Sequence, residues 1–254
     1  MTAAVKRTLA GQTRFWLWCI ALIWVTHSVA YFAHEYAHSG SAWLLGYKSN
    51  PLAIEYGRFN LANVVTLRQV DENVDYGTIF AQGHGWAAAG IAFAGAGIGN
   101  GLLYLMSRLL LRRQSIRHRK PVFLCLFWLC LMCVGNFYDY VPIRTFASHG
   151  DIAHITQGLR VSPWLVLAVL GYPIAWAMWH FFARILPDAL QLLAPDLRSQ
   201  RVALVIVCTI LIFGYYGVSG LFGYGEVSHA LSGISVLAIP GVIAACWPSA
   251  SPHA

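Results

Sequence analysis

Charged residues are scarce in this sequence. Only 11% of its 254 residues are Asp, Glu, Lys or Arg, whereas 58% are hydrophobic. A soluble domain carries about 25% charged residues, so this composition excludes an ordinary soluble protein. Several apolar runs reach the roughly 20 residues that a helix needs to cross a bilayer. The sequence therefore predicts an all-α polytopic membrane protein.

Polar loops contain no cysteine. All six cysteines lie in or beside apolar runs: Cys19, Cys125, Cys130, Cys133, Cys208 and Cys246. This placement argues against a disulfide framework and indicates small buried hydrophobes. Cys130 and Cys133 have the spacing of metal or redox ligands, but a second such pair is missing.

Two further functional classes, nucleic-acid binding and nucleotide binding, lack support in the sequence. The net charge of +7 does not indicate nucleic-acid binding, because the basic residues cluster between apolar runs, as in membrane proteins. The glycine-rich stretch at 90–101 has no strand–turn–helix context, which excludes a nucleotide-binding loop. Instead, Gly95/Gly99 and Gly97/Gly101 have the four-residue spacing that lets membrane helices approach closely.

The apolar runs predict about six transmembrane helices in a single membrane-embedded domain, 1–254. The expected spans are 15–32, with helix continuing to 45, and then 79–111, 121–140, 163–185, 202–218 and 227–247. The first run is too long for a signal peptide, so we expect it to be uncleaved. Basic loops at 108–120 and 184–201 predict cytoplasmic N- and C-termini.

The longest polar stretch, 47–77, follows the first span. Two strand-like runs, 52–56 and 62–67, flank the residues 57–60, so we expect a short β-hairpin. The hairpin would be either a solvent-exposed connector or an edge strand that holds an extended peptide.

A histidine motif ends the first span. His34 and His38 are four residues apart, so on a helix both imidazoles share one face and can hold one zinc ion. Glu35 lies beside them, where it can accept a proton from a metal-activated water; this is the HExxH pattern of zinc hydrolases. The competing interpretation is a buried histidine pair that hydrogen-bonds the carboxylate. Burying three ionisable groups in a membrane is costly, which favours a functional site.

A two-histidine zinc site needs a third protein ligand. The second polar concentration, 136–154, offers four candidates: Asp139, His149, Asp151 and His154. His27, two turns before His34, could hydrogen-bond the ligands or simply pack against another helix. Glu226 and His229 have the spacing of a second metal site, or form a polar pair at the membrane interface.

With both polar clusters in view, the chain resembles the site-2 protease family of membrane-embedded zinc metalloproteases. The HExxH motif, followed by Ala42 and Gly46, matches the first part of the family pattern, and Asn136, Pro142 and Asp151 resemble the second. In the family an Asp-Gly pair supplies the third ligand, whereas here Gly150 precedes Asp151. The match covers about 1–160, the expected metalloprotease core, and 161–254 would be additional transmembrane helices.

The resemblance implies a multi-pass protein of a bacterial cytoplasmic membrane that hydrolyses membrane-protein substrates. Zn²⁺ would be held by His34, His38 and Asp151, and Glu35 would be the general base. Asn136 would donate a hydrogen bond to the oxyanion, as its family counterpart does. A substrate helix would have to unwind, because helical peptide bonds are shielded.

Two other functions remain open on the sequence. One is a membrane metal enzyme that acts on lipid, with one or two metals held by residues of both clusters and of the 226–229 pair. The other is a non-enzymatic protein that carries metal or haem, or that escorts a membrane partner.

Overall fold

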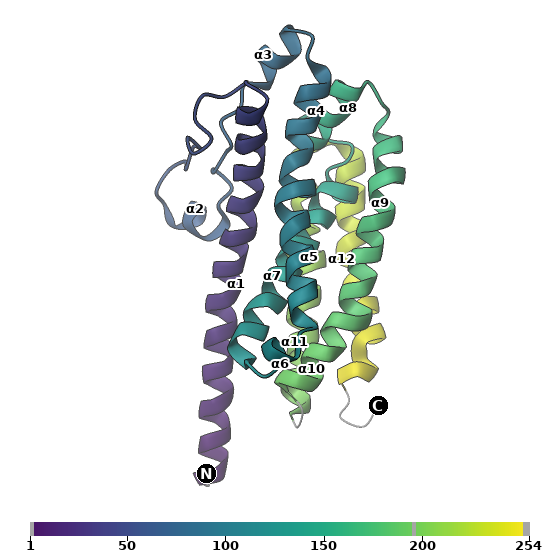
Figure 1. Ribbon diagram of the computed structural model, residues 1–254. Coiled ribbons are helices and arrows are strands. Elements are labelled where there is room, and N and C mark those ends of the chain that lie inside the picture. The colour runs from purple at the N-terminus through teal and green to yellow at the C-terminus, as the bar shows by residue number, and fades with distance from the viewer. Residues whose placement is uncertain (1–2, 195–196, 251–254) are drawn as a thin grey trace.

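Long apolar helices set the architecture (Figure 1). The computed structural model describes residues 3–194 and 197–250. In this part of the chain, six helical segments are long and apolar enough to cross a membrane: Ala10–Leu44, Gly85–Leu111, Lys120–Ile143, Pro163–Leu193, Arg198–Leu221 and Glu226–Trp247. The expected all-α polytopic fold is confirmed, and the chain is an integral, multi-pass membrane protein.

The spans are built from α-helices and short π-helical segments. The α-helices are α1 (Ala3–Leu44), α2 (Leu61–Thr66), α3 (Tyr76–Ala81), α4 (Gly85–Ala94), α5 (Gly101–Leu111), α6 (Gln114–Arg117), α7 (Lys120–Tyr138), α8 (Asp151–Leu159), α9 (Pro163–His180), α10 (Leu186–Leu193), α11 (Arg198–Thr209) and α12 (Glu226–Ala250). The π-helical segments are η1 (Gly95–Asn100), η2 (Asp139–Ile143), η3 (Phe181–Ile185) and η4 (Ile210–Tyr216), and η5 (Ser219–Leu221) is a 3-10 turn. The start of α1 and the end of α12 lie at the same end of the bundle (Figure 1).

Helix α7 is the most deeply buried span and forms the centre of the core. Its Phe127 and Trp128 are fully buried, and Phe127 stacks on Phe181 of η3. Cys130 and Cys133 are free thiols buried in the same cluster. The interpretation of the cysteines as small hydrophobes is therefore confirmed for this pair.

Two glycines of η1 allow the second span to touch α1. A Cβ added at Gly99 would lie 2.4 Å from the carbonyl oxygen of Ala33, and one at Gly95 would lie 2.2 Å from Nε2 of His38. The close approach expected from Gly95/Gly99 is confirmed. Gly97 and Gly101 do not make such a contact with α1. A Cβ added at Gly97 would meet only the Phe93 ring of the same span, and a Cβ at Gly101 would meet nothing nearer than 3.7 Å.

The expected β-hairpin is wrong. No strand occurs in 3–194 or 197–250, and 62–66 falls in helix α2 instead. The reason is local: Asn60 caps α2, because its side-chain oxygen accepts a hydrogen bond from the amide of Asn63 at 2.9 Å. A single antiparallel bridge, Glu55 to Asp71, joins the two ends of the segment.

The segment that contains α2 lies along the first span (Figure 1). Three α1 side chains donate hydrogen bonds to its carbonyl oxygens: Trp24 to Val64 (3.0 Å), His27 to Thr66 (3.2 Å) and Tyr31 to Val70 (3.4 Å). Later residues of α1 contact later residues of the segment, so 64–72 runs parallel to α1. Glu72, near the end of this stretch, therefore lies close to Glu35.

The contact between η1 and α1 gives a first prediction. Gly99→Ala should lower the melting temperature in detergent, because the added methyl overlaps a backbone carbonyl, and such overpacking costs about 1–3 kcal/mol. Gly101→Ala is the matched control; its Cβ meets nothing nearer than 3.7 Å, so its melting temperature should stay at the wild-type value or rise. Equal melting temperatures for the two variants would contradict the close packing.

Candidate metal centre

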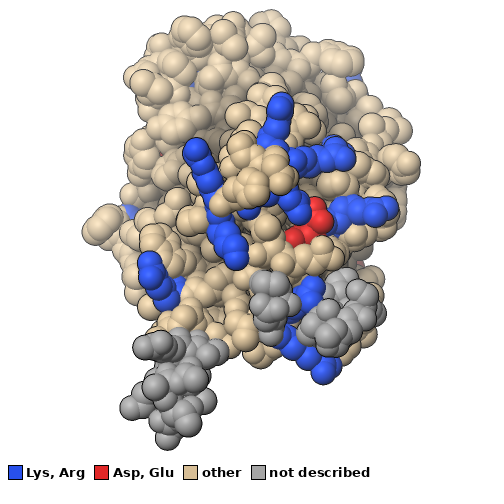
Figure 2. Space-filling view, turned by 60° about the horizontal axis from the view of Figure 1, so that its bottom comes forward, with Lys and Arg blue, Asp and Glu red and all other residues tan. Residues whose placement is uncertain are grey.

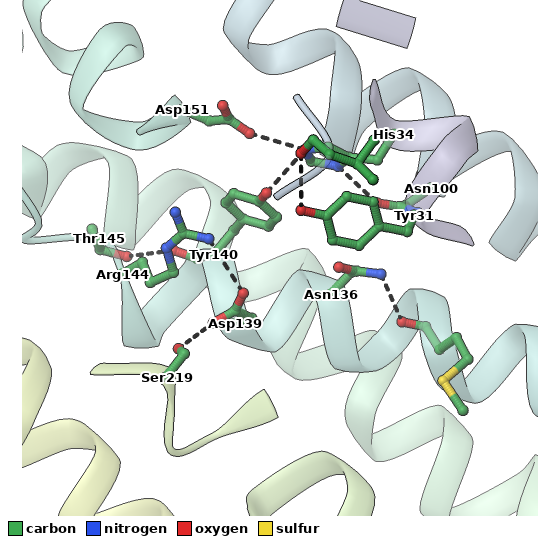
Figure 3. A network of polar contacts seen from close by, with 12 residues as sticks. Tyr31, His34, Asn100, Asn136, Asp139, Tyr140, Arg144, Thr145, Asp151 and Ser219 are labelled. Carbon is green, nitrogen blue, oxygen red and sulfur yellow. Dashed lines mark hydrogen bonds and ion pairs between the residues drawn. The ribbon is translucent and has the colours of Figure 1, made fainter. Parts of the chain in front are cut away.

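The two polar clusters of the sequence meet at one point (Figure 3). Nε2 of His34 lies 2.9 Å from Nε2 of His38 and 3.0 Å from Oδ2 of Asp151, and the third separation is 3.2 Å. Both histidines are buried on α1, and Asp151 begins α8. Within 3–194 and 197–250, these three residues form the only group of His, Cys, Asp or Glu placed to hold a metal ion.

Hydrogen bonds on the far side of each imidazole fix its tautomer. Asn100 donates from Nδ2 to the carbonyl of Ala30 (2.8 Å), so its Oδ1 accepts from Nδ1 of His34 (3.0 Å). Nδ1 of His38 donates to the carbonyl of Ile91 (2.7 Å). In its neutral form each ring thus carries its hydrogen on Nδ1 and presents a bare lone pair at Nε2.

The donor set fits a divalent cation. In those tautomers two imidazole lone pairs and one carboxylate oxygen converge, an arrangement that a cation at its centre would stabilise. Tetrahedral zinc, with bonds of about 2.0–2.2 Å, places its ligand atoms about 3.3 Å apart. The observed separations of 2.9–3.2 Å are within a few tenths of that value.

Gly150 precedes Asp151 for a structural reason. Gly150 caps α8 with φ of +84°, a conformation that favours glycine. This turn puts the carboxylate of Asp151 on the first residue of the helix, where the helix dipole stabilises negative charge.

The rival third ligands lie elsewhere. Asp139 pairs with Arg144 at 3.4 Å and accepts a hydrogen bond from Ser219. His149 packs against Tyr224, and His154 stacks on Tyr76 with ring centroids 4.0 Å apart. Burial lowers the pKa of His154, so its ring is neutral at pH 7.

The 226–229 pair does not join the metal group. His27 does not reach the ligands either: its ring hydrogen-bonds Thr66 and the Tyr216 hydroxyl (3.3 Å), so it packs between elements.

Glu35 faces a cavity of about 720 Å³ that also contains the ligands. Its side chain is buried, and Glu72 lies close enough to share a hydrogen bond with it. The cavity therefore contains a second acid beside the HExxH glutamate.

Three other polar groups line the cavity near the ligands. Tyr140 stacks on His34 with centroids 4.9 Å apart, and its hydroxyl is 3.0 Å from Nε2 of that residue. Arg144 lies over the ring of Tyr140 at 4.9 Å. Asn136 donates one hydrogen bond to the carbonyl of Met132 at 3.2 Å, which leaves its second N–H free for another acceptor.

The last third of the chain contributes to this site. Tyr215, Tyr216, Phe222 and Tyr224 all line the cavity. The Tyr216 hydroxyl reaches back to His27 on α1. The division at residue 160 made on the sequence is thus not a division of the cavity.

A second hollow, about 290 Å³ and almost wholly apolar, borders Asp151. It shares Tyr140 and Asp151 with the polar cavity, and its rim includes the partly exposed Phe93 and Leu105. Asp151 therefore borders both a polar space and an apolar one.

Sequence reasoning missed Asn100, Tyr140 and Glu72. Asn100 had a usable signal, because a lone amide inside an apolar span is rare and marks a polar contact. Tyr140 and Glu72 gave no such signal in the sequence, because only the fold brings Tyr140 next to His34 and Glu72 next to Glu35.

Comparison with known proteins gives no match to any family model, any curated protein or any solved structure.

The metal centre gives a second prediction. Purified protein should contain one zinc per chain by mass spectrometry of the metal, and Asp151→Ala should reduce this to near zero, since two histidines alone do not complete a zinc site. His149→Ala and His154→Ala are the matched controls from the same segment and should keep full zinc. Full zinc in Asp151→Ala would contradict the assignment.

The packing of η1 against the two histidines of α1 gives a third prediction. In Gly95→Ala the new methyl would lie within 2.2–2.6 Å of both imidazoles, so zinc content should fall by more than half. Gly90→Ala, on the same span with nothing within 4 Å, should bind zinc like the wild type. Full zinc in both variants would show that the contact tolerates a methyl.

Proposed function

We propose that this chain is a membrane-embedded zinc metalloprotease, similar to the site-2 protease family, that cleaves membrane-protein substrates. One observation carries the proposal: two imidazole nitrogens and a carboxylate converge beside a buried glutamate in a cavity of about 720 Å³ within a helix bundle. This is the donor set of a hydrolytic zinc site with three protein ligands.

His34, His38 and Asp151 would hold the zinc. Bound there, it would polarise the scissile carbonyl and lower the pKa of a water molecule. Asn100 and the carbonyl of Ile91 keep the two imidazoles in the tautomer that binds metal. The chain's own groups then position the substrate and move protons.

Glu35 is the proposed general base. It follows the first histidine on the same helix, is buried, and faces the cavity. It would take the proton of the attacking water and pass it to the leaving amine. Glu72, which shares a hydrogen bond with it, would orient the Glu35 carboxyl.

Two neutral donors are placed to stabilise the oxyanion. Tyr140 has its hydroxyl at the ligand group, and Asn136 lines the same cavity with one N–H unused. Donors fixed before reaction are worth about 2.7–4 kcal/mol each in comparable enzymes.

The two spaces that flank the ligands suit a peptide substrate. Its unwound backbone needs polar surroundings, which the larger cavity provides, and an apolar side chain could occupy the hollow behind Asp151. The 64–72 segment forms one wall of the polar side.

The di-metal alternative loses support, because the second set of candidate ligands does not gather in the described residues. A mononuclear enzyme acting on lipid would use the same ligands and would place an acyl chain in the apolar hollow. A metal carrier would need the ligands but not Glu35.

Glu35→Gln tests the proposal. The variant should keep one zinc per chain but lose at least about 100-fold in turnover, the smallest usual contribution of a positioned general base. Wild type and variant are to be produced in the same host, and terminal peptides of its membrane proteins compared by mass spectrometry. New termini inside or beside transmembrane segments should appear with the wild type only.

Thr66→Ala, on the cavity wall but without an acid, is the control and should give the wild-type pattern. Identical peptide termini with wild type and Glu35→Gln would refute proteolysis. A change confined to the host lipids would transfer the proposal to the lipid enzyme.

A further inference from the structure

A separate pocket lies far from the metal centre, at the end of the bundle where the basic side chains gather (Figure 2). It has a volume of about 350 Å³. The end of α5, the first turns of α7 and the stretch from α9 to α10 enclose it. These are the termini of the second and third spans, so the pocket lies at a membrane surface.

The pocket has an excess of positive charge. Arg108, Arg112 and Arg184 line it, and none of them makes an ion pair with any residue in 3–194 or 197–250. Asp188 is the one acid in the lining, and Arg117 already pairs with it at 3.1 Å. Three guanidinium groups thus face the pocket without a counter-charge.

Buried polar atoms in the lining also lack partners. Nε of Arg108 and Nδ1 of His180 are shielded from solvent and make no hydrogen bond. Both side chains are held in place by Trp176: the guanidinium lies 4.9 Å from its ring centroid, and the imidazole stacks on it at 5.1 Å. Buried donors without acceptors are rare and call for an acceptor that the protein does not supply.

The rest of the lining is apolar. Leu111, Phe123 and Ile185 are buried, and Trp179 is exposed at the edge. A free inorganic anion would leave this surface uncovered. A phospholipid would cover it with its glycerol and upper acyl groups while its phosphate faced the arginines.

We propose that this pocket binds the head group of an anionic phospholipid, with the phosphate held by Arg108, Arg112 and Arg184. Guanidinium groups bind phosphate oxygens through paired hydrogen bonds. Basic pockets between transmembrane helices at a membrane surface are suited to anionic head groups. The inference is independent of the proposed protease activity.

The test uses the full-length protein in neutral detergent, titrated with phosphatidylglycerol or phosphatidylcholine, with bound lipid counted by native mass spectrometry. The variant Arg112→Gln/Arg184→Gln changes two exposed side chains of the pocket. It should bind phosphatidylglycerol about tenfold or more weakly than the wild type, since each basic residue near an anionic surface adds several-fold. Phosphatidylcholine should bind weakly to both.

Arg113→Gln/Arg119→Gln is the matched control, because it removes the same charge from exposed positions outside the pocket. It should bind phosphatidylglycerol like the wild type. Equal weakening in both double variants would refute a defined site in favour of diffuse charge. The last titration uses inorganic phosphate. If the Arg112→Gln/Arg184→Gln variant also weakened phosphate binding, and phosphatidylglycerol bound the wild type no more tightly than phosphate, the lipid assignment would be wrong. A zinc content equal to wild type shows that each variant is folded.

Discussion

Three lone pairs that point at one another inside a bundle of apolar helices impose the main constraint on this molecule. Left alone, the group formed by His34, His38 and Asp151 is repulsive, and apolar surroundings increase that cost. The structure nevertheless fixes each tautomer, through Asn100 and a backbone carbonyl, so that the lone pairs converge. A divalent cation at the centre of the group would relieve that repulsion. The close packing of Gly95 against both rings serves the same geometry.

Much of this could be predicted from the sequence, because the strongest signals are periodic. Six apolar runs gave six spans, and a four-residue spacing placed two imidazoles on one helix face. The two glycines that touch α1 were also predictable from their spacing. Each of these features depends on residues near one another in the chain, where helical geometry alone fixes the outcome.

Contacts between distant segments were harder to predict. The polar stretch after the first span contains β-branched residues at strand-like spacing, but Asn60 and Asn63 fold it locally into a helix and turns. Its path along α1 is then set by side chains that lie about 40 residues earlier in the chain. Neither the capping nor this path follows from hydrophobic periodicity, so Glu72 could not be placed beside Glu35 in advance.

The path of that segment explains how water chemistry can be contained in a membrane bundle. Irregular backbone at membrane depth is tolerated only where it is buried in protein or lines a watery cavity. Here both conditions hold: Trp24, His27 and Tyr31 satisfy its carbonyls, and its inner side forms a wall of the polar cavity. On the outside, Phe59 and Leu61 are 98% and 80% exposed, as suits residues that face lipid. The segment therefore presents apolar side chains on its outer face while its inner side forms a wall of the polar cavity.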